Sequence, residues 1–412
     1  MMWVGVQGLQ DARPRRLHIT RHFCLRCILP CLFELYSYPM RLLLLHLASL
    51  ATAVRPPRLS WEKVGDLAFF HGSVMNELAL SASDAALLSR FPCVTLEKWQ
   101  GCNSTPGCYH SASPSATCPT QQAGTLAVAA QLKALDPTVW IASWLDSLRI
   151  YEPIQSLNPA FRDISYQSCV RPAASRFLDT HPAYLLPNAS GLPAQDSYLN
   201  AHVFDHRQEE VRALWRDVCL NLTATGLIDG CGADASQQPY TYLQGVNANV
   251  GVAWEAGRNW TLGNTTAAIA PLGGFVLGKL EFELGAYTNG VLQEGCTAGN
   301  DTINVLRAAA AASVRDGTTY LYECHSNGEV DDLASFLLGA YPGAFWGFGG
   351  WVQPNGGLAG RWLPIFDKPL GAPAADAAYD AASRSWSRAF AHAHVTFSFE
   401  KPAGHRGEIS FS

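Results

Sequence analysis

Acidic residues stand at or near the ends of short apolar runs along much of this chain. They are Glu97, Asp234, Glu294 and Glu323, with Asp229 and Asp205 close behind. Their recurrence is informative, because parallel strands of an α/β barrel bring their C-terminal ends to one rim. Hydrolysis of a glycosidic bond needs two such carboxyl groups, one to protonate the leaving oxygen and one to act as nucleophile or to activate water. We therefore predict that several of these acids share a pocket, where crowding and burial separate their pKa values.

Aromatic residues accompany the acids. The rings nearest the expected strand ends belong to Trp99, Trp144, Trp346, Phe348 and Trp351. Flat apolar ring faces are suited to stacking on sugar rings. For each ring taken alone, packing in an ordinary core is the competing interpretation.

The stretch from Thr225 to Ala235, Thr-Gly-Leu-Ile-Asp-Gly-Cys-Gly-Ala-Asp-Ala, indicates how the acids would be positioned. A run from Arg207 to Leu222 precedes it, and its apolar residues recur at the three- and four-residue spacing of a helix. The unit is therefore a helix, a glycine turn and a short buried strand, which aims at least one of Asp229 and Asp234 at the pocket. The alternative is that Asp229 caps a turn before Gly230 and that Asp234 caps the next helix.

Alternating strand and helix patterns fill most of the chain. Strands are predicted at residues 66–72, 92–99, 138–144, 227–234, 274–280, 290–296, 318–324 and 344–348. Helices are predicted at residues 83–90, 123–135, 207–222, 240–260, 302–315 and 329–338. This alternation is typical of the α/β class and its (β/α)8 or TIM barrel, which needs roughly 250 residues. We assign the barrel to residues 60–362.

Two regions depart from the alternation. Residues 146–206 are rich in Pro, Asn and Ser, and a connection of this length is expected to form one wall of a binding cleft, with a short extra strand at 198–205. After Trp362, residues 385–391, 394–399 and 407–411 alternate polar with apolar side chains. We predict a small antiparallel β appendage at residues 363–412, reached through a turn-rich linker at 367–373.

The N-terminal residues indicate export. Residues 40–53 combine a basic start, an apolar run of about a dozen residues and a small-x-small end, as a secretory signal peptide does. The run is too short for a stable membrane anchor. Because it begins at an internal methionine, we expect residues 1–39 to be a mispredicted or disordered extension. A cytosolic or organelle-targeted extension with a buried hydrophobic helix is the alternative.

Glycosylation motifs and cysteines also favour a secreted or lumenal location. Sequons begin at Asn103, Asn188, Asn221, Asn259, Asn264 and Asn300, so N-glycans are expected. Nine cysteines follow the signal segment, at positions 93, 102, 108, 118, 169, 219, 231, 296 and 324. Cys102, Cys108 and Cys118 lie in a Ser/Pro/Gly-rich loop and predict disulfides, with zinc as the competing reading. Nine is odd, and we expect Cys231, in a core strand, to be the free thiol.

Composition limits the class of protein. Only 15% of residues are charged and 48% are hydrophobic, which is typical of a globular chain and not of a disordered one. The formal net charge is −5, and it becomes about −9 without the first 53 residues, which carry six Arg and two acids. An acidic protein is a poor candidate for binding nucleic acid. The expected partner is a carbohydrate substrate.

Five segments carry a resemblance to a known group. They are Asp205-His-Arg-Gln-Glu-Glu-Val-Arg-Ala-Leu-Trp215, Gly226-Leu-Ile-Asp-Gly-Cys-Gly-Ala-Asp234, Gly274-Phe-Val-Leu-Gly278, Gly290-Val-Leu-Gln-Glu-Gly295, and Lys368-Pro-Leu-Gly371 with a closing strand pair. Together they resemble the glycoside-hydrolase-like (β/α)8-barrel proteins, many of which have no assigned substrate. The similarity runs from about Phe70 to Phe411 and is strongest from Asp205 to Cys296.

The resemblance implies a glycosidase of carbohydrate metabolism that cleaves an oligo- or polysaccharide with two carboxylates and no cofactor. It makes Asp234 the nucleophile or electrostatic partner, Glu294 the acid/base and Asp229 a residue that orients the site. Around them we expect substrate-binding positions at Glu97, Trp99, Trp144, Asp205, Lys279, Glu323 and Trp346.

Departures from the group's pattern keep other functions open. Asn is usual where this chain has Gly278 and Lys279, and bulky apolar residues are usual where it has Cys231 and Gly232. A barrel that binds carbohydrate without turnover, for example at a cell surface, is one alternative.

A metal-dependent hydrolase is the other alternative. Asp229, Asp234 and Glu294 could supply hard oxygen ligands to a divalent cation. Histidines that could join them are His71, His202 and His325. Serine hydrolase chemistry is disfavoured because the sequence has no Gly-x-Ser-x-Gly elbow.

Overall fold

The structure is a computed structural model. It describes residues 60–101, 104, 121–146, 149–150, 182–197, 202–279, 287–316, 320–350, 352–353 and 357–412. Predictions for residues 1–39 and 40–53, for the cysteines at 102, 108, 118 and 169, for the sequon at Asn103 and for Trp351 lie outside these residues, as does most of the 146–206 region.

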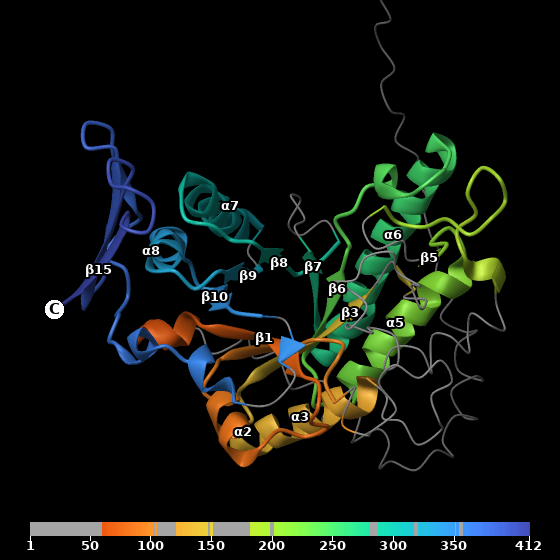
Figure 1. Cartoon of the computed structure of the whole chain (residues 1–412), viewed down its shortest axis with the longest axis horizontal. Helices are drawn as coiled ribbons and strands as arrows, with labels where there is room; N and C mark the ends of the chain where they lie inside the picture. Colours follow the sequence, from red (N-terminus) through yellow and green to blue (C-terminus); the bar gives the residue numbers. More distant parts are fainter. Residues whose placement is uncertain are drawn as a thin grey trace, which may run out of the picture. The chain divides into compact units, whose positions relative to one another are not determined.

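Eight parallel strands form a barrel with helices on its outside (Figure 1). They are β1 (Phe69–Val74), β2 (Cys93–Leu96), β3 (Trp140–Asp146), β6 (Gly230–Asp234), β7 (Phe275–Lys279), β8 (Gly290–Glu294), β9 (Leu321–Ser326) and β10 (Ala344–Phe348). Neighbours pair in the order β10-β9-β8-β7-β6-β3-β2-β1. A parallel bridge between Ala68 and Trp346 joins the first strand to the last. The predicted TIM barrel is therefore confirmed, and each predicted strand overlaps an observed one.

Helices follow most strands. They are α2 (Ala82–Leu88), α3 (Gln121–Leu135), α5 (Glu209–Ala224), α6 (Ala248–Ile269), α7 (Asn300–Asp316) and α8 (Val330–Gly339). The largest departure from prediction is α6, expected at 240–260. Gly245, at a φ of 68°, turns the chain before the helix, and Pro271 lies in the 3-10 turn Ala270–Leu272 that follows it. In the part of the chain that the structure describes, no helix is long and apolar enough to cross a membrane.

The barrel interior is filled by large rings set against glycines. Its buried apolar side chains are Phe69, Cys93, Trp140, Ala142, Trp144, Phe275, Leu277, Leu292, Leu321 and Phe345. A Cβ added to Gly232 would lie 1.7 Å from the ring of Trp144, and one added to Gly230 would lie 2.5 Å from the ring of Phe275. The glycines of β6 therefore leave room for these rings, which accounts for Gly232 at a position where bulky residues are usual.

The substitution Gly232→Ala should destabilise the fold. The new methyl group would displace Trp144, which is fully buried, and overpacking of this kind costs about 2 kcal/mol. Urea unfolding followed by tryptophan fluorescence would measure the loss. Gly360→Ala is the matched control, because a Cβ at Gly360 meets nothing within 4 Å, and it should change stability by less than about 0.5 kcal/mol. Equal effects of the two substitutions would contradict this account of the interior.

The region between β3 and α5 packs beside the end of β6. Its described strands β4 (Arg149–Ile150) and β5 (His202–Val203) pair antiparallel, so the predicted extra strand is present but short. Leu186, Ala194 and Val203 form a core cluster with Ala235, which directly follows Asp234. This region therefore lies next to the expected site.

The C-terminal appendage is the predicted antiparallel sheet. Its strands are β12 (Ala378–Asp380), β13 (Ser385–Ala389), β14 (Ala393–Ser398) and β15 (Gly407–Phe411). It packs on α8, as Figure 1 shows, and both ends of that helix are tied to it. Asp331 accepts hydrogen bonds from the backbone N–H groups of Gly404 and Gly407, each at 2.7 Å, and Arg388 donates to the carbonyl groups of Leu337 and Ala340.

The described cysteines correct one prediction. Disulfides join Cys219 to Cys231 and Cys296 to Cys324, and Cys93 is the free cysteine among the described residues. The assignment of Cys231 as the free thiol was wrong. Side chains alternate along a strand, so Cys231 points outward to α5 while Gly230 and Gly232 point inward. Cys93 lies inside the barrel instead.

Candidate active site

Asp234 lies at the C-terminal end of β6 between two ammonium groups. Its Oδ2 is 2.7 Å from Nζ of Lys98, and its Oδ1 is 3.0 Å from Nζ of Lys279. Lys98 is 1% exposed, so its charge is compensated inside the protein. Burial acts to raise the pKa of Asp234, but the two ammonium groups outweigh it and hold that pKa well below its ordinary value. Asp234 is therefore ionised at neutral pH.

Glu294, at the end of β8, shares Lys279 with Asp234. Its Oε2 is 2.6 Å from Nζ of Lys279. Since Oδ1 of Asp234 and Oε2 of Glu294 both contact this one nitrogen, they can be no more than about 5.6 Å apart. Burial raises the pKa of Glu294, Lys279 opposes the rise, and Asp234 adds to it. The two predicted catalytic carboxylates therefore lie together with pKa values shifted in opposite directions.

A third carboxylate, Glu97, lies on the other side of Asp234. It directly follows β2, its Oε1 is 3.1 Å from Nε2 of His71, and its Oε2 is 3.4 Å from Nζ of Lys98. Burial raises the pKa of Glu97 to about 7, with Asp234 adding to the rise and Lys98 opposing it. Burial also lowers the pKa of His71 well below its ordinary value, so this imidazole is neutral. Glu97 thus titrates near neutral pH.

The backbone around Asp234 is held in an unusual conformation. Ala235, the next residue, has a φ of 61°, which costs an alanine about 1 kcal/mol or more. Its N–H donates to Oδ1 of Asp234 at 2.8 Å. Ser236 then accepts a hydrogen bond from the backbone N–H of Lys279 at 2.7 Å. This strained turn joins the end of β6 to the end of β7 and directs the Asp234 carboxylate at the lysines.

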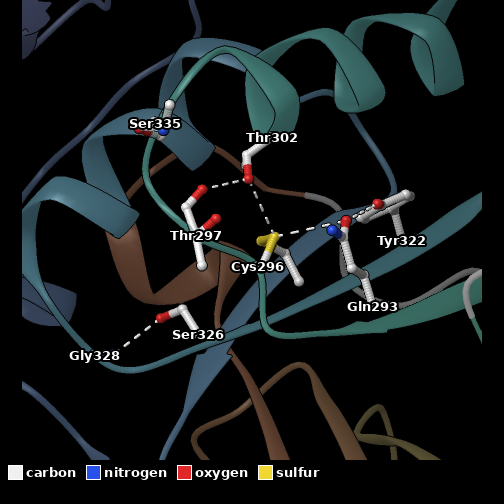
Figure 2. Close-up of a disulfide and its surroundings, with 10 residues drawn as sticks. Gln293, Cys296, Thr297, Thr302, Tyr322, Ser326, Gly328 and Ser335 are labelled. Atoms are coloured by element: carbon white, nitrogen blue, oxygen red, sulfur yellow. Dashed lines mark hydrogen bonds between the residues drawn. A yellow bond between two sulfur atoms is a disulfide. The ribbon is translucent and has the colours of Figure 1, made fainter. Parts of the chain in front are cut away.

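The chain that follows Glu294 is anchored as well. Figure 2 shows Cys296, two residues beyond it, beside Gln293 and Thr302. The disulfide to Cys324 ties this loop to β9, and the N–H of Cys296 donates to the carbonyl of His325 at 2.8 Å. Thr302 donates to the carbonyl of Thr297 at 2.6 Å. These bonds hold the end of β8 in register, and Glu294 with it.

Solved structures of similar fold include carbohydrate-active enzymes. The chain is 14% identical to the glycoside hydrolase domain of PelA from Pseudomonas aeruginosa, over 70% of this chain and 94% of that one, with a TM-score of 0.41. It is 9% identical to a maltogenic α-amylase, AmyB, from Thermotoga neapolitana, over 80% and 84% of the two chains, with a TM-score of 0.46. A search of curated proteins finds no match.

A comparison with sequence families decides the relationship. The family described as hypothetical glycosyl hydrolase family 15 matches residues 156–394, which is more than half of the chain. The chain belongs to this family. The predicted membership of a glycoside-hydrolase-like group is thereby confirmed.

Several of the predicted site residues come together at the C-terminal rim of the barrel. Asp234, Glu294, Lys279 and Glu97 form one charged network. Trp99 lies beside it, its ring 4.6 Å from Nζ of Lys98. Trp144 is fully buried below, 5.3 Å from the ring of His71. Trp144 therefore supports the floor of the site.

Other predicted site residues lie elsewhere in the family 15 barrel. Asp229 precedes β6, about 16 Å along the strand from Asp234, and pairs with Nζ of Lys133 at 2.7 Å and the N–H of Ile141 at 2.8 Å. Asp205 accepts hydrogen bonds from Arg207 and Gln208 at the start of α5. Trp346 points outward from β10.

Physical reasons account for these positions. Asp229 is at the N-terminal end of its strand, so it faces the opposite end of the barrel. Trp346 has the outward parity on β10 and packs on Phe348 and Phe366 in the layer beneath the helices. The metal alternative needed Asp229 beside Asp234, and the described residues contain no group of three or more His, Cys, Asp or Glu that could hold a metal ion.

Glu323 lies inside the barrel, in the layer below Glu294. It is 0% exposed and accepts hydrogen bonds from Thr95 at 2.8 and 2.9 Å and from the thiol of Cys93 at 3.1 Å. Burial raises its pKa to about 7 and these hydrogen bonds oppose the rise. Glu323 therefore has no surface for a substrate and titrates inside the barrel near neutral pH.

Glu323 should make stability depend on pH. Its pKa rises from 4.5 in a free side chain to about 7 in the folded protein, so the unfolded chain ionises first as pH increases. Stability is fully present below pH 4.5 and is lost as pH rises to 7, by about 3 kcal/mol. Glu323→Gln, which mimics the protonated acid, should remove this part of the decrease. Urea unfolding at pH 4.5 and pH 8 measures it, and an unchanged decrease in the variant would contradict the assignment.

Two residues of the site were not predicted from the sequence. Lys98 is the closest partner of Asp234, and Asp146, the last residue of β3, is paired in register with Asp234. A lysine directly after Glu97, at the end of the short buried strand β2, is an available signal for the first. Side chains alternate along a strand, so a continued β2 would have placed Lys98 on the outside of the barrel. The strand ends at Leu96, however, and the turn that follows brings Lys98 over the rim.

Proposed function

We propose that this protein is a secreted glycoside hydrolase that cleaves an oligo- or polysaccharide with retention of anomeric configuration. The observation that carries the proposal is the pair of oxygens, one from Asp234 and one from Glu294, held within about 5.6 Å by Lys279. Retaining enzymes have carboxyl groups about 5–5.5 Å apart, whereas inverting enzymes need about 6.5–9.5 Å for an intervening water. Membership of a glycosyl hydrolase family supports the class of reaction.

Asp234 acts as the nucleophile in the proposed mechanism. Its ionised carboxylate attacks the anomeric carbon while Glu294 gives its proton to the leaving oxygen, so that the glycosidic bond breaks as the glycosyl ester forms. Glu294, now ionised, takes a proton from water, which attacks the same carbon and releases Asp234. The lowered pKa of Asp234 and the raised pKa of Glu294 suit these two roles.

The lysines position the reacting groups. Lys98 is buried and contacts Oδ2 of Asp234. This contact fixes the orientation of the Asp234 carboxylate. Lys279 must release Glu294 when this acid is protonated, and it can stay with Oδ1 of Asp234 as it does so. Glu97 and His71, whose side chains contact each other at 3.1 Å, complete the buried side of the network.

Export through the secretory route is part of the proposal. Two disulfides are typical of proteins from oxidising compartments. Among the described sequons, Asn221 and Asn300 are exposed, as attached glycans would require. The apolar signal-like segment and the number of sequons support the same route.

A saccharide-binding protein without turnover is the second candidate. Lys279 favours it, because an ammonium group 2.6 Å from Glu294 stabilises the ionised form of the residue that should donate a proton.

Hydrolysis of a panel of oligosaccharides by the full-length secreted protein tests the proposal. We expect release of sugar, with a first-formed product that keeps the anomeric configuration of the substrate, as read by proton NMR within the first minutes. A product of inverted configuration would overturn the assignment of Asp234 as nucleophile. Binding of a saccharide that is never cleaved would favour the second candidate.

A further inference from the structure

A groove lies at a different place from the carboxylates. It has a volume of about 1050 Å³ and is lined by α7, by the residues between α8 and β10, and by the C-terminal appendage. In a (β/α)8 barrel the helices run antiparallel to the strands, so the ends of α7 and α8 that line the groove lie away from the catalytic rim. The groove is therefore separate from the proposed active site.

Two guanidinium groups in the groove have unused capacity. Arg307, on α7, is exposed and stacks 5.2 Å from the ring of Trp386, and among the described residues no carboxylate pairs with it. Arg388 is 8% exposed and donates through Nε and Nη1 to backbone carbonyl groups. Within the described part of the chain, Nη2 of Arg388 has no acceptor.

The charge of the groove is opposite to that of the chain. The chain has a net charge of −5, yet the groove contains Arg307, Arg315 and Arg388 and one acid, Asp376. Arg315 is already paired with Asp316, which leaves Arg307 and Arg388. These two repel each other electrostatically, and at Arg388 the opposite effect of Asp376 is the larger one. An anion between them could form paired, charge-assisted hydrogen bonds with the guanidinium groups.

Other side chains favour a sugar as the carrier of that anion. Trp61 is half-buried at the edge of the groove and offers a flat apolar face. Asn304, exposed on the same face of α7 as Arg307, can bond to hydroxyl groups. The choice of a saccharide over a peptide rests on the proposed function.

We propose that this groove binds a carboxylate-bearing polysaccharide, with guanidinium groups of Arg307 and Arg388 on its carboxylates and Trp61 beside its rings. The groove would anchor the protein on an acidic glycan at a point away from the catalytic rim.

Binding to polygalacturonate tests the groove. The full-length chain carrying Asp234→Asn serves as the parent, so that cleavage does not interfere, and titration calorimetry compares polygalacturonate with its fully methyl-esterified form. We expect measurable binding of the acid form, at least about tenfold weaker binding of the ester, and weakening by added salt. Binding is read independently of catalysis, so failure of the hydrolase proposal leaves this result intact.

Substitutions place the ligand in the groove. Arg307→Gln and Asn304→Asp, both at exposed positions of α7, should each weaken polygalacturonate binding at least about tenfold. Arg384→Gln is the matched control, since Arg384 is an exposed arginine of the same appendage that pairs with Glu400 outside the groove, and it should bind like the parent. Absence of binding, equal binding of the ester, tighter binding of poly-glutamate, or equal effects of Arg307→Gln and Arg384→Gln would each overturn the proposal.

Discussion

Asp234→Asn should lower the rate of saccharide cleavage at least about 10⁴-fold, which corresponds to more than about 5 kcal/mol of transition-state stabilisation. The amide cannot attack the anomeric carbon, and it cannot stabilise a developing positive charge as the carboxylate does. Steady-state kinetics on the best substrate of the panel would measure the loss. Unfolding must be measured beside it, because the substitution removes the carboxylate that lies 2.7 Å from the buried Nζ of Lys98, and the loss of a counter-charge to a buried charge is destabilising.

Asp229→Asn gives a sharp comparison on the same strand. The resemblance to related barrels makes Asp229 part of the site, whereas the structure pairs it with Lys133 at the other end of β6. From the structure we expect a loss of stability with kcat within a few-fold of wild type. A loss of kcat comparable to that of Asp234→Asn, in a protein that remains folded, would show that the geometry of β6 described above is wrong.

Glu294→Gln should have the second largest effect. General acid–base catalysis contributes about 10²–10⁴-fold, so cleavage of natural glycosides should fall by that factor. Aryl glycosides with a leaving group that needs no proton should still form the glycosyl-enzyme, and azide should then restore turnover by attacking it. Kinetics with the two substrate types, with and without azide, would measure these effects. Because the acid must be protonated, the wild-type rate falls as pH rises through the raised pKa of Glu294, and this decrease should be absent from the variant.

Glu97→Gln is the control for the identity of the acid. Glu97 also has a raised pKa, of about 7, but its side chain is only 4% exposed and contacts His71 and Lys98. We expect a smaller loss of rate and no rescue by azide. If azide rescued Glu97→Gln and left Glu294→Gln unchanged, the two glutamates would have to exchange roles.

Patterns along the chain were sufficient for the barrel. The strands of such a barrel are covered by helices on the outside and by other strands on the inside. Because both faces are buried, each strand appears in the sequence as a short apolar run. The acids at the ends of β6 and β8 could then be brought together without coordinates, because parallel strands share a direction. Side chains alternate along β6, so Asp234 points inward and Cys231 points outward. The prediction that Cys231 is the free thiol did not take this alternation into account.

Glycine positions show where local patterns become insufficient. Gly232 departs from the usual pattern, and nothing near it in the sequence explains the departure. The ring of Trp144, from the neighbouring strand, occupies the space that a side chain would need. Such compensation joins residues far apart in the chain, so it is visible only when the strands are packed.

By itself, the sequence determined the class of fold and the family, because burial and strand direction produce regular patterns along the chain. It also predicted the two carboxylates to which we assign catalysis. Tertiary structure alone decided which of the other acids join these two. It placed Asp229 at the far end of β6, buried Glu323 below the rim, and brought Lys98 and Lys279 onto Asp234. The physical reason is that the pKa of an acid, and hence its chemistry, depends on charges within a few ångströms, and those charges come from other strands.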